Sequence, residues 1–320
     1  MPEPALSVVI VNWNTRELLR QCLTSIHQAS VGLAVEVIVV DNASQDGSAE
    51  LVAAEFPHVG LIRNQTNLGF ARANNAAAMQ SQGRYLLFLN SDTVVRPDSL
   101  RVLIAFLEAH PEVGMVGPRL LGRDGRPQRS YRGRPTIRAL LHRLALVRWT
   151  GLFRQDYVRY RRAAFDPEHQ REVETVLGAA VSLPREVFFG HGGWDEKFPF
   201  GLEDFDMSIR VARTHAVVFF PGAEIVHFGR MSSRQNVGYE YVGVECGYAR
   251  YLKKHVLGPV GVLGYKLLVT LDVPVAVAVE AVKALWRRWR RGPASPGRPH
   301  SELGPLWHFT TRGLPLVWKS

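Results

Sequence analysis

Acidic and amide side chains recur in this sequence in a fixed order, where apolar runs end or helical patterns begin. Asp41 and Asp92 each come at or just after the end of an apolar run typical of a buried strand. Asp204 begins a helical pattern, and His227 follows a later strand-like run. Open α/β sheets place ligand-binding groups at the carboxyl ends of their strands. The order therefore predicts one site that holds a nucleotide diphosphate, a metal ion and a catalytic base.

Asp41 and a segment downstream of it have the chemistry of a nucleoside site. A short carboxylate at a strand end can accept hydrogen bonds from a ribose hydroxyl or a base imide. The alternative for Asp41 is that it only caps the next turn. Gly69 permits close backbone approach, and Arg72 and Asn74 offer donors for base or phosphate oxygens.

Asp92 and His227 have the chemistry of a metal site. A divalent cation could bridge the Asp92 carboxylate to a diphosphate, and it would neutralise the charge on the leaving phosphate. The alternative for Asp92 is a turn-capping role ahead of Pro97. A lone histidine is more often structural than a ligand, but the place of His227 in the ordered set favours the ligand.

Glu203 and Asp204 could supply the base, because a helix N-terminus stabilises ionised carboxylates. One of them could take a proton from an acceptor hydroxyl while the other orients it. The alternative is that either residue only caps the helix. The loop before them, residues 192–201, is aromatic and could form a stacking wall.

Strand-like and helix-like patterns alternate along the first 120 residues, which predicts a right-handed βαβ sheet. The expected strands are 7–11, 35–40, 59–63 and 85–89. Thr15 is a candidate cap for the helix that follows the first strand. Further along, the sequence predicts a helix over 203–213 and a strand over 217–220.

The length of 320 residues and the 46% hydrophobic content suffice for a full core with an appendage. Cys22 and Cys246 form no disulfide framework or metal spacing, and we expect both to be buried. The start of the chain has no basic region followed by a long apolar run, so we expect a cytoplasmic location.

The positive charge is concentrated in one segment. Residues 119–162 contain thirteen arginines and two acids, a local charge of +11 against +10 for the whole chain. Such a field suits an anionic partner such as a phosphate group or an acidic lipid surface. The alternative is a solvated basic face.

The sequence beyond Gly258 is apolar but interrupted by charges such as Lys266 and Asp272. No uncharged run reaches the ~20 residues that a membrane-spanning helix needs, so we do not expect one. Residues 286–291, Trp-Arg-Arg-Trp-Arg-Arg, resemble an interfacial membrane anchor. The equal alternative is a set of amphipathic helices packed on the main domain.

The ordered motifs resemble the inverting glycosyltransferases of family 2 with the GT-A fold, particularly the bacterial rhamnosyltransferase-like branch that builds cell-surface polysaccharides. The resemblance covers residues 7–233 and rests on segments 9–14, 40–48, 67–71, 89–92, 192–196 and 203–206. It implies an α/β fold, a Rossmann-like, mostly parallel sheet with helices on both faces. It also implies a catalytic domain over 1–235, with a nucleotide-binding half 1–120 and an acceptor-binding half 120–235, and a C-terminal helical extension over 236–320.

The resemblance assigns roles residue by residue. Asp204 would be the catalytic base, with Glu203 beside it, and Asp92 and His227 would hold Mg²⁺ or Mn²⁺. The expected nucleotide and donor contacts are Asn12, Asn14, Asp41, Asn42, Gly69, Arg72, Asn74, Asn90, Ser91, Gly178 and Ala179. The expected acceptor-side residues are Trp194, Asp195 and Phe200. Asn90 departs from the family's D-x-D pattern, because it replaces the first acid with a neutral, weaker ligand.

The implied reaction moves rhamnose or a similar sugar from a dTDP- or UDP-sugar to a hydroxyl of a glycan or polyprenyl-diphosphate-linked acceptor. The implied location is cytoplasmic, on the inner face of the cell membrane, with an anionic membrane surface as a partner. The alternative is an inactive, membrane-attached nucleotide-sugar-binding or scaffold protein, which Asn90 motivates. Nucleic acid is not an expected partner, because the arginine-rich segment lacks a binding module and interleaved stacking aromatics. A nucleotidyltransferase should carry a glycine-rich loop where this chain has Asn-Trp-Asn at 12–14.

Overall fold

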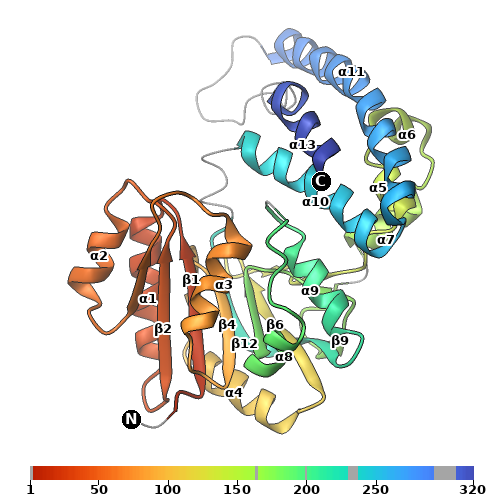
Figure 1. Cartoon of the computed structure of the whole chain (residues 1–320). Helices are drawn as coiled ribbons and strands as arrows, with labels where there is room; N and C mark the ends of the chain where they lie inside the picture. Colours follow the sequence, from red (N-terminus) through yellow and green to blue (C-terminus); the bar gives the residue numbers. More distant parts are fainter. Residues whose placement is uncertain (1–2, 163–164, 199, 230–236, 292–307) are drawn as a thin grey trace. The chain divides into compact units, whose positions relative to one another are not determined.

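The computed structural model describes residues 3–162, 165–198, 200–229, 237–291 and 308–320 (Figure 1). The chain divides into two compact units. The first comprises Met1–Arg134, Ala164–Glu196 and Glu203–Gln235, and the second comprises Pro135–Ala163, Lys197–Leu202 and Asn236–Ser320. The last division falls between Gln235 and Asn236, the same place as the expected limit, but the second unit also takes two earlier segments. The domain limits inferred from the sequence stay a prediction.

The first unit is built on one large sheet with the strand order β3-β2-β1-β4-β11-β6-β12-β5. Its first half is parallel and consists of β1 (Leu6–Asn12), β2 (Val35–Asp41), β3 (Gly60–Arg63) and β4 (Tyr85–Asn90). The other half holds β5 (Thr93–Val95), β6 (Val113–Leu121), β11 (Ala180–Pro184) and β12 (Ala216–His227). The four expected N-terminal strands and the mostly parallel α/β fold are therefore confirmed.

Helices cover both faces of this sheet because its central strands are apolar on both sides. Val8 and Ile10 of β1 pack with α1 (Arg16–Ala29), α2 (Ser48–Glu55) and α4 (Ser99–Ala109). Val9 points to the other face and packs with α3 (Phe70–Gln80), α8 (Arg185–Gly190) and α9 (Glu203–Val211). The alternation follows from the two-residue period of a strand.

Four short strands extend the sheet region. β7 (Pro127–Gln128) pairs with β6, and β9 (Arg171–Glu172) pairs with β12. β8 (Tyr131–Arg132) and β10 (Thr175–Val176) form a separate antiparallel pair. These pairings join parts of the arginine-rich segment to the first unit.

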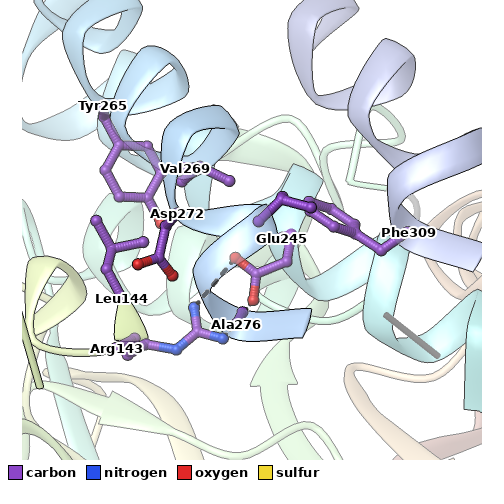
Figure 2. Close-up of a pocket in the computed structure, with 9 residues that line it drawn as sticks. Arg143, Leu144, Glu245, Tyr265, Val269, Asp272, Ala276 and Phe309 are labelled. Atoms are coloured by element: carbon purple, nitrogen blue, oxygen red, sulfur yellow. Dashed lines mark hydrogen bonds and ion pairs between the residues drawn. The ribbon is translucent and has the colours of Figure 1, made fainter. Parts of the chain in front are cut away.

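The second unit is helical. Its helices are α5 (Ile137–Leu141), α6 (Ala145–Thr150), α7 (Arg154–Arg162), α10 (Val237–His255), α11 (Gly258–Arg291), the π-helix η2 (Phe309–Gly313) and α13 (Leu314–Lys319). A cavity of ≈ 60 Å³ lies between them, where Arg143 pairs with Glu245 beside Asp272 (Figure 2). A C-terminal helical part is thus present, as expected.

Local expectations have mixed outcomes. Cys22 and Cys246 are free and buried, as expected. Thr15 precedes α1, but its side chain makes no capping bond, so that expectation is wrong. The Thr15 hydroxyl instead donates to Asn12 Oδ1 at 2.6 Å and lies 2.7 Å from Ser91 Oγ. It therefore joins two loops of the strand edge.

The helix α11 differs from the expectation for the C-terminal part. Residues Gly258–Trp286 form a helix that is long and apolar enough to cross a membrane, judged by length and composition only. A third of its most apolar window is buried inside the protein. A single helix of this kind is weak evidence for a membrane span, since core helices of soluble proteins can have the same length and composition.

Candidate functional site

The carboxyl ends of four strands define the edge of the sheet at which the site lies. β1, β2 and β4 are parallel, and β11 is antiparallel to both β4 and β6. Because β12 is parallel to β6, it runs in the same direction as β4. Asp41, Asp92 and His227 therefore stand at or just past strand ends on the same edge. Of these groups, the structure brings His227 close to Asp92, which lies 135 positions earlier in the sequence.

The buried carboxylate of Asp41 is held by two groups. Its Oδ1 accepts a hydrogen bond from Asn12 Nδ2 at 3.2 Å, and its Oδ2 accepts one from the backbone N–H of Ser44 at 3.0 Å. The second bond caps the following turn, which is the alternative role that the sequence left open for Asp41. A carboxylate has about four acceptor positions, so the turn leaves capacity for a nucleoside hydroxyl.

Asn12 and Asn14 shape the same loop from the end of β1. Asn12 Nδ2 also donates to Ser44 Oγ at 3.1 Å, and Asn14 Oδ1 accepts from the backbone N–H of Gln45 at 2.8 Å. Asn14 has a φ of 53°, a left-handed conformation that asparagine tolerates. Both amides thus fix the loop that carries Asp41, and their contact with a donor stays a prediction.

Asn42 fastens the loop that leads into α3. Its Nδ2 donates to Asn67 Oδ1 at 2.8 Å, and its Oδ1 accepts from the N–H of Leu68 at 2.9 Å and from Asn64 Nδ2 at 3.0 Å. Gly69 then begins the helix with a φ of 80°, which favours glycine. Asn42 is therefore bonded within the protein, and its expected donor contact stays a prediction.

Arg72 and Asn74 both lie on α3, but the Arg72 side chain is exposed and Asn74 is buried. The Arg72 side chain is 63% exposed, and its Nε is 4.0 Å from the Glu196 carboxylate. Asn74 is buried, and its Nδ2 donates to the carbonyl of Phe70 at 2.9 Å. Arg72 is thus free to turn toward an anionic ligand, whereas the Asn74 amide nitrogen is bound within its helix.

Asn90 and Ser91 connect β4 to Asp92. The N–H of Asn90 donates to the carbonyl of Ala179 at 3.0 Å, which places Ala179 beside the expected donor contacts. Ser91 is buried, and its hydroxyl contacts Thr15. These bonds fix the backbone from which the Asp92 carboxylate projects.

Asp92 and His227 face one another across the strand edge. His227 Nε2 lies 3.5 Å from Asp92 Oδ1, longer than an ordinary N–H···O hydrogen bond. Both side chains are mostly buried. His227 Nε2 is also buried and has no hydrogen-bond partner within the described residues. A buried ring nitrogen beside a carboxylate is a geometry that a divalent cation would satisfy.

Gln128 on β7 decides which His227 nitrogen is available. Gln128 Nε2 donates to the carbonyl of His227 at 2.9 Å, so Gln128 Oε1 is the atom 3.1 Å from His227 Nδ1. An amide oxygen can only accept, so Nδ1 of a neutral imidazole carries the proton. The lone pair then sits on Nε2, which is the nitrogen that faces Asp92.

Asp92 and His227 suit a cation whose remaining coordination positions are filled by a bound ligand. Within the described residues, no group of three or more His, Cys, Asp or Glu side chains is placed to hold a metal. Mg²⁺ sites often use one or two protein groups together with substrate phosphate oxygens. Two protein ligands at the strand edge are therefore enough for a metal held jointly with a diphosphate.

Asp204 lies in the first turn of α9 and is buried. Its Oδ2 accepts from the N–H of Gly178 at 2.8 Å, and its Oδ1 accepts from the N–H of Phe205 at 2.9 Å. A Cβ atom at Gly178 would lie 3.4 Å from the same carboxylate. Burial raises the pKa of Asp204, while these backbone bonds and the charge of Arg132 oppose the rise. A carboxylate with a raised pKa is a better proton acceptor than an ordinary aspartate.

Glu203 precedes Asp204 and is buried as well. It lies in the first turn of α9, where the helix dipole stabilises a negative charge. Two carboxylates thus lie at the start of one helix, as the sequence predicts. Glu203 could orient the carboxylate of Asp204.

Trp194 lies in the core, so its ring forms no exposed stacking wall, and an acceptor contact of this residue stays a prediction. Its side chain is only 1% exposed, and its ring packs against Phe70, Phe88 and Phe188. A tryptophan in an aromatic-rich loop suggests a stacking wall, but here burial of its large apolar ring in the core prevails. Asn75 ties the loop down, because its side chain bonds both the N–H and the carbonyl of Trp194.

The other two expected acceptor-side residues lie in different units. Asp195 is half-buried in the first unit. Phe200 belongs to the second unit and lies against Gly243 of α10, where an added Cβ would meet the Phe200 side chain at 2.5 Å. An acceptor contact of either residue stays a prediction.

A buried ion pair on α9 escaped the sequence analysis. Asp206 is fully buried and pairs with Arg210 one turn later, at 2.8 Å. Arg210 also donates to the carbonyls of His191 and Gly193, so it ties the glycine-rich loop to α9. The i, i+4 spacing of an acid and an arginine was a signal that could have identified this pair.

Comparison with known proteins agrees with this geometry. The sequence model of the family "Glycosyl transferase family 2" matches residues 7–167. The N-acetylglucosaminyl-diphospho-decaprenol L-rhamnosyltransferase of Mycobacterium tuberculosis is 28% identical over 236 residues, covering 69% of this chain and 75% of that protein. The O-antigen biosynthesis protein RfbC of Myxococcus xanthus is 28% identical over 267 residues, covering 81% of this chain but 20% of that protein.

Solved structures share the fold. The mannosyltransferase PcManGT of Pyrobaculum calidifontis, in complex with GDP-Man and Mn²⁺, superposes with a TM-score of 0.54 at 18% identity, covering 99% of this chain and 86% of that one. GalNAc-T7 with UDP, GalNAc and Mn²⁺ gives a TM-score of 0.53 at 17% identity, covering 80% of this chain and 52% of that one. At these identities the likeness shows the fold alone.

Proposed function

Because the chain belongs to glycosyl transferase family 2 and is a glycosyltransferase of polysaccharide synthesis, we propose the following reaction. The protein transfers rhamnose or a similar sugar, with inversion, from a dTDP- or UDP-sugar to a hydroxyl of a glycan or polyprenyl-diphosphate-linked acceptor. The observation that carries this proposal is the buried Asp204 carboxylate, whose pKa is raised by burial, at the start of α9. It is joined to Gly178, next to the strand edge that bears Asp92 and His227.

In the proposed mechanism Asp204 accepts the proton of the acceptor hydroxyl. The hydroxyl oxygen forms a bond to the anomeric carbon as the bond from that carbon to the nucleoside diphosphate breaks on the opposite side, which inverts the configuration. Arg132 keeps enough of Asp204 ionised to act as a base, because a nearby positive charge favours the carboxylate form. Gly178 leaves room beside the carboxylate, since any side chain there would lie against it.

The leaving group departs at the strand edge. Asp92 and His227 would hold Mg²⁺ or Mn²⁺, which when bound would neutralise the charge that builds on the diphosphate. Gln128 orients the His227 ring for this purpose. Asp41 would accept from the nucleoside, and Asn12 and Ser44 hold its carboxylate in place. Asn90 supplies a neutral oxygen where the family has an acid.

The acceptor and the location are part of the proposal. The name of the Mycobacterium tuberculosis relative describes a decaprenol diphosphate acceptor, which is anchored in a membrane by its lipid. A similar acceptor would require this protein to work in the cytoplasm at the inner face of the cell membrane. The second candidate function is an inactive nucleotide-sugar-binding scaffold, which the substitution at Asn90 favours.

A panel of nucleotide sugars tests the proposal. Purified protein is heated with UDP-, dTDP- and GDP-sugars, each with and without Mn²⁺, because a ligand that binds only the native state raises the unfolding temperature. Transfer to lipid-linked acceptors is then measured for the wild type, Asp204→Asn and the exposed control Asp124→Asn. We expect Asp204→Asn to keep nucleotide-dependent stabilisation and to lose transfer by roughly a thousandfold, since the base is removed.

The outcomes separate the two candidate functions. Stabilisation by a nucleotide sugar without transfer to any acceptor would favour the scaffold. A fully active Asp204→Asn protein would overturn the assignment of the base but leave the glycosyltransferase proposal standing.

A further inference from the structure

On helix α11 the exposed face is apolar and charged residues are buried, which is the reverse of an ordinary surface helix. Between Gly258 and Val282, every exposed residue is apolar, glycine or proline. Among the described side chains of α11, the large apolar ones that are exposed are Val260, Leu263, Leu267, Leu268, Leu271, Val282, Leu285, Trp286 and Trp289, and Lys283 is exposed as well. A soluble protein normally turns such a stripe inward, so this surface is unusual.

The charged residues in the same stretch are buried instead. Lys266 donates to the backbone oxygens of Trp318 at 3.2 Å and Ser320 at 2.8 Å. The Asp272 carboxylate lies in the cavity of Figure 2, and Glu280 pairs with Lys283. Because buried charges need partners, these bonds fix which face of α11 packs against the second unit. The leucine face is therefore the outward face.

A second helix of this unit, bonded to α11, also exposes apolar side chains. Asp272 accepts from the N–H groups of Ala145 at 2.7 Å and Leu146 at 2.9 Å, so the start of α6 is bonded to α11. The two helices lie side by side in the second unit (Figure 1). Beyond this junction, Leu146 and Leu152 are exposed, and the Trp149 side chain is 89% exposed.

Positive charge surrounds the exposed residues of α6. The segment 135–163 contains seven arginines and one acid, Asp156. Among these arginines, Arg138, Arg148, Arg154 and Arg159 are exposed. Exposed leucine and tryptophan with arginine alongside is the composition of a surface that inserts into the headgroup region of an anionic bilayer.

We propose that the outward face of α11, together with Leu146, Trp149 and Leu152 on the α6 side, is a docking surface for an anionic lipid bilayer. We name it the α6/α11 face. α11 lies in the plane of the membrane with its leucines in the acyl boundary, while Lys266, Asp272 and Glu280 stay against the protein. This inference deepens the proposed function, because a polyprenyl-linked acceptor is presented at such a surface.

The partners of the buried charges favour an in-plane helix over a spanning one. A spanning α11 would have to carry Lys266, Asp272 and Glu280 through the hydrocarbon core, which is unfavourable for each charged residue near its centre. It would also have to carry α6 and α13, which are bonded to it through Asp272 and Lys266. The arginines favour anionic lipid over a second copy of the chain, because two copies would bring like charges together.

Vesicle flotation tests the proposal with the full-length chain and no nucleotide sugar. We expect binding to vesicles that contain phosphatidylglycerol, and weaker binding to pure phosphatidylcholine vesicles. The variant Leu263→Gln/Leu267→Gln/Leu271→Gln should bind at least about tenfold more weakly, because it lacks three leucine side chains whose transfer from water into the membrane interface is favourable. The matched control Val31→Gln/Met79→Gln, on two exposed residues of the first unit, should bind like the wild type.

Two further measurements separate the alternatives. Arg148→Gln/Arg154→Gln should lose most of the preference for anionic vesicles. Fluorescence quenching by lipids brominated near the headgroup should exceed quenching by lipids brominated near the bilayer centre, and Trp149→Phe should reduce it. Wild-type binding by the leucine variant, or stronger quenching from the bilayer centre, would overturn the in-plane surface.

A dimer that the leucine variant dissociates, in a protein that binds no vesicles, would assign the face to a second copy. The experiments distinguish a failure of this membrane-docking proposal from a failure of the proposed function. Loss of sugar transfer in every assay would leave the vesicle results unchanged, and loss of vesicle binding would leave transfer to a soluble acceptor unchanged.

Discussion

At the residue scale, the hydrogen bonds of Gln128 determine which nitrogen of His227, the proposed metal ligand, carries the proton. Because Gln128 must donate to a carbonyl with its nitrogen, its oxygen faces His227 Nδ1 and leaves the Nε2 lone pair toward Asp92. A hydrogen-bond partner on the other ring nitrogen fixes both the tautomer and the ring orientation of a metal-binding histidine. Gln128 is thus a positioning residue of the site.

We predict that Gln128→Leu weakens Mn²⁺ binding about tenfold or more, the usual effect of removing such a partner. The dissociation constant is measured from the free Mn²⁺ signal in electron paramagnetic resonance, with nucleoside diphosphate at saturation. Gln128→Glu should recover part of the affinity, because its carboxylate can still accept from Nδ1. The exposed control Gln82→Leu should not change it, and an unchanged constant in Gln128→Leu would remove Gln128 from the site.

The charge near Asp204 predicts a pH effect. Burial raises the Asp204 pKa and Arg132 lowers it, and the base works only when ionised. The value of kcat/KM should therefore fall as the pH drops through this raised pKa. Arg132→Gln should move that fall to higher pH, since a favourable positive charge is lost. The control Arg134→Gln, on an exposed neighbour, should leave the profile in place, and equal profiles for both variants would contradict the role of Arg132.

At the scale of elements, α9 joins Glu203 and the proposed base Asp204 to the loop before them. Glu203 and Asp204 lie in its first turn, and the buried pair of Asp206 and Arg210 fastens it to the carbonyls of His191 and Gly193. The helix start is thereby fixed on two sides, by Gly178 and by this loop. A carboxylate held in this way loses little further conformational entropy when it reaches the transition state.

We predict that Arg210→Met lowers the free energy of unfolding by about 3 kcal/mol, because a fully buried carboxylate loses a charged partner. Urea unfolding measures the change. Arg213→Met, on an exposed arginine just past the end of the helix, should change stability by less than about 0.5 kcal/mol. Equal stabilities for the two variants would show that the pair does not hold the helix.

At the scale of the whole molecule, the chemistry and the basic apolar surface belong to different compact units. The strand edge with Asp41, Asp92 and His227 lies in the first unit, and the α6/α11 face lies in the second. Inside the second unit, Arg143 pairs with Glu245 (Figure 2). The Arg143 guanidinium also stacks on the Tyr248 ring, 4.1 Å from its centroid.

We predict that Arg143→Met destabilises the protein by about 3 kcal/mol, because Glu245 is left buried without this partner. The affinity for nucleoside diphosphate should stay within about twofold of the wild type, since the residues expected to bind it lie in the first unit. Thermal unfolding and calorimetric titration measure the two quantities. Arg138→Met is the exposed control, and a large loss of nucleotide affinity in Arg143→Met would contradict the separation.

The sequence by itself determined the N-terminal strands, the helices between them and the placement of Asp41, Asp92 and Asp204 at strand or helix ends. These features depend on the periodicity of neighbouring residues, which is a local property. It could not determine that Trp194 is a core residue, because an aromatic loop residue has the same local pattern whether it packs inward or outward.

Only the tertiary structure decided the partners of the site and the orientation of α11. Gln128 and Arg132 come from short strands whose pairing brings them to His227 and Asp204, across 99 and 72 positions of sequence. In α11 the sequence shows leucines and charges on one helix, and ordinary burial would turn the leucines inward. The partners of Lys266 and Asp272 lie on other helices, so packing alone decided that the charges face the protein and the leucines face outward.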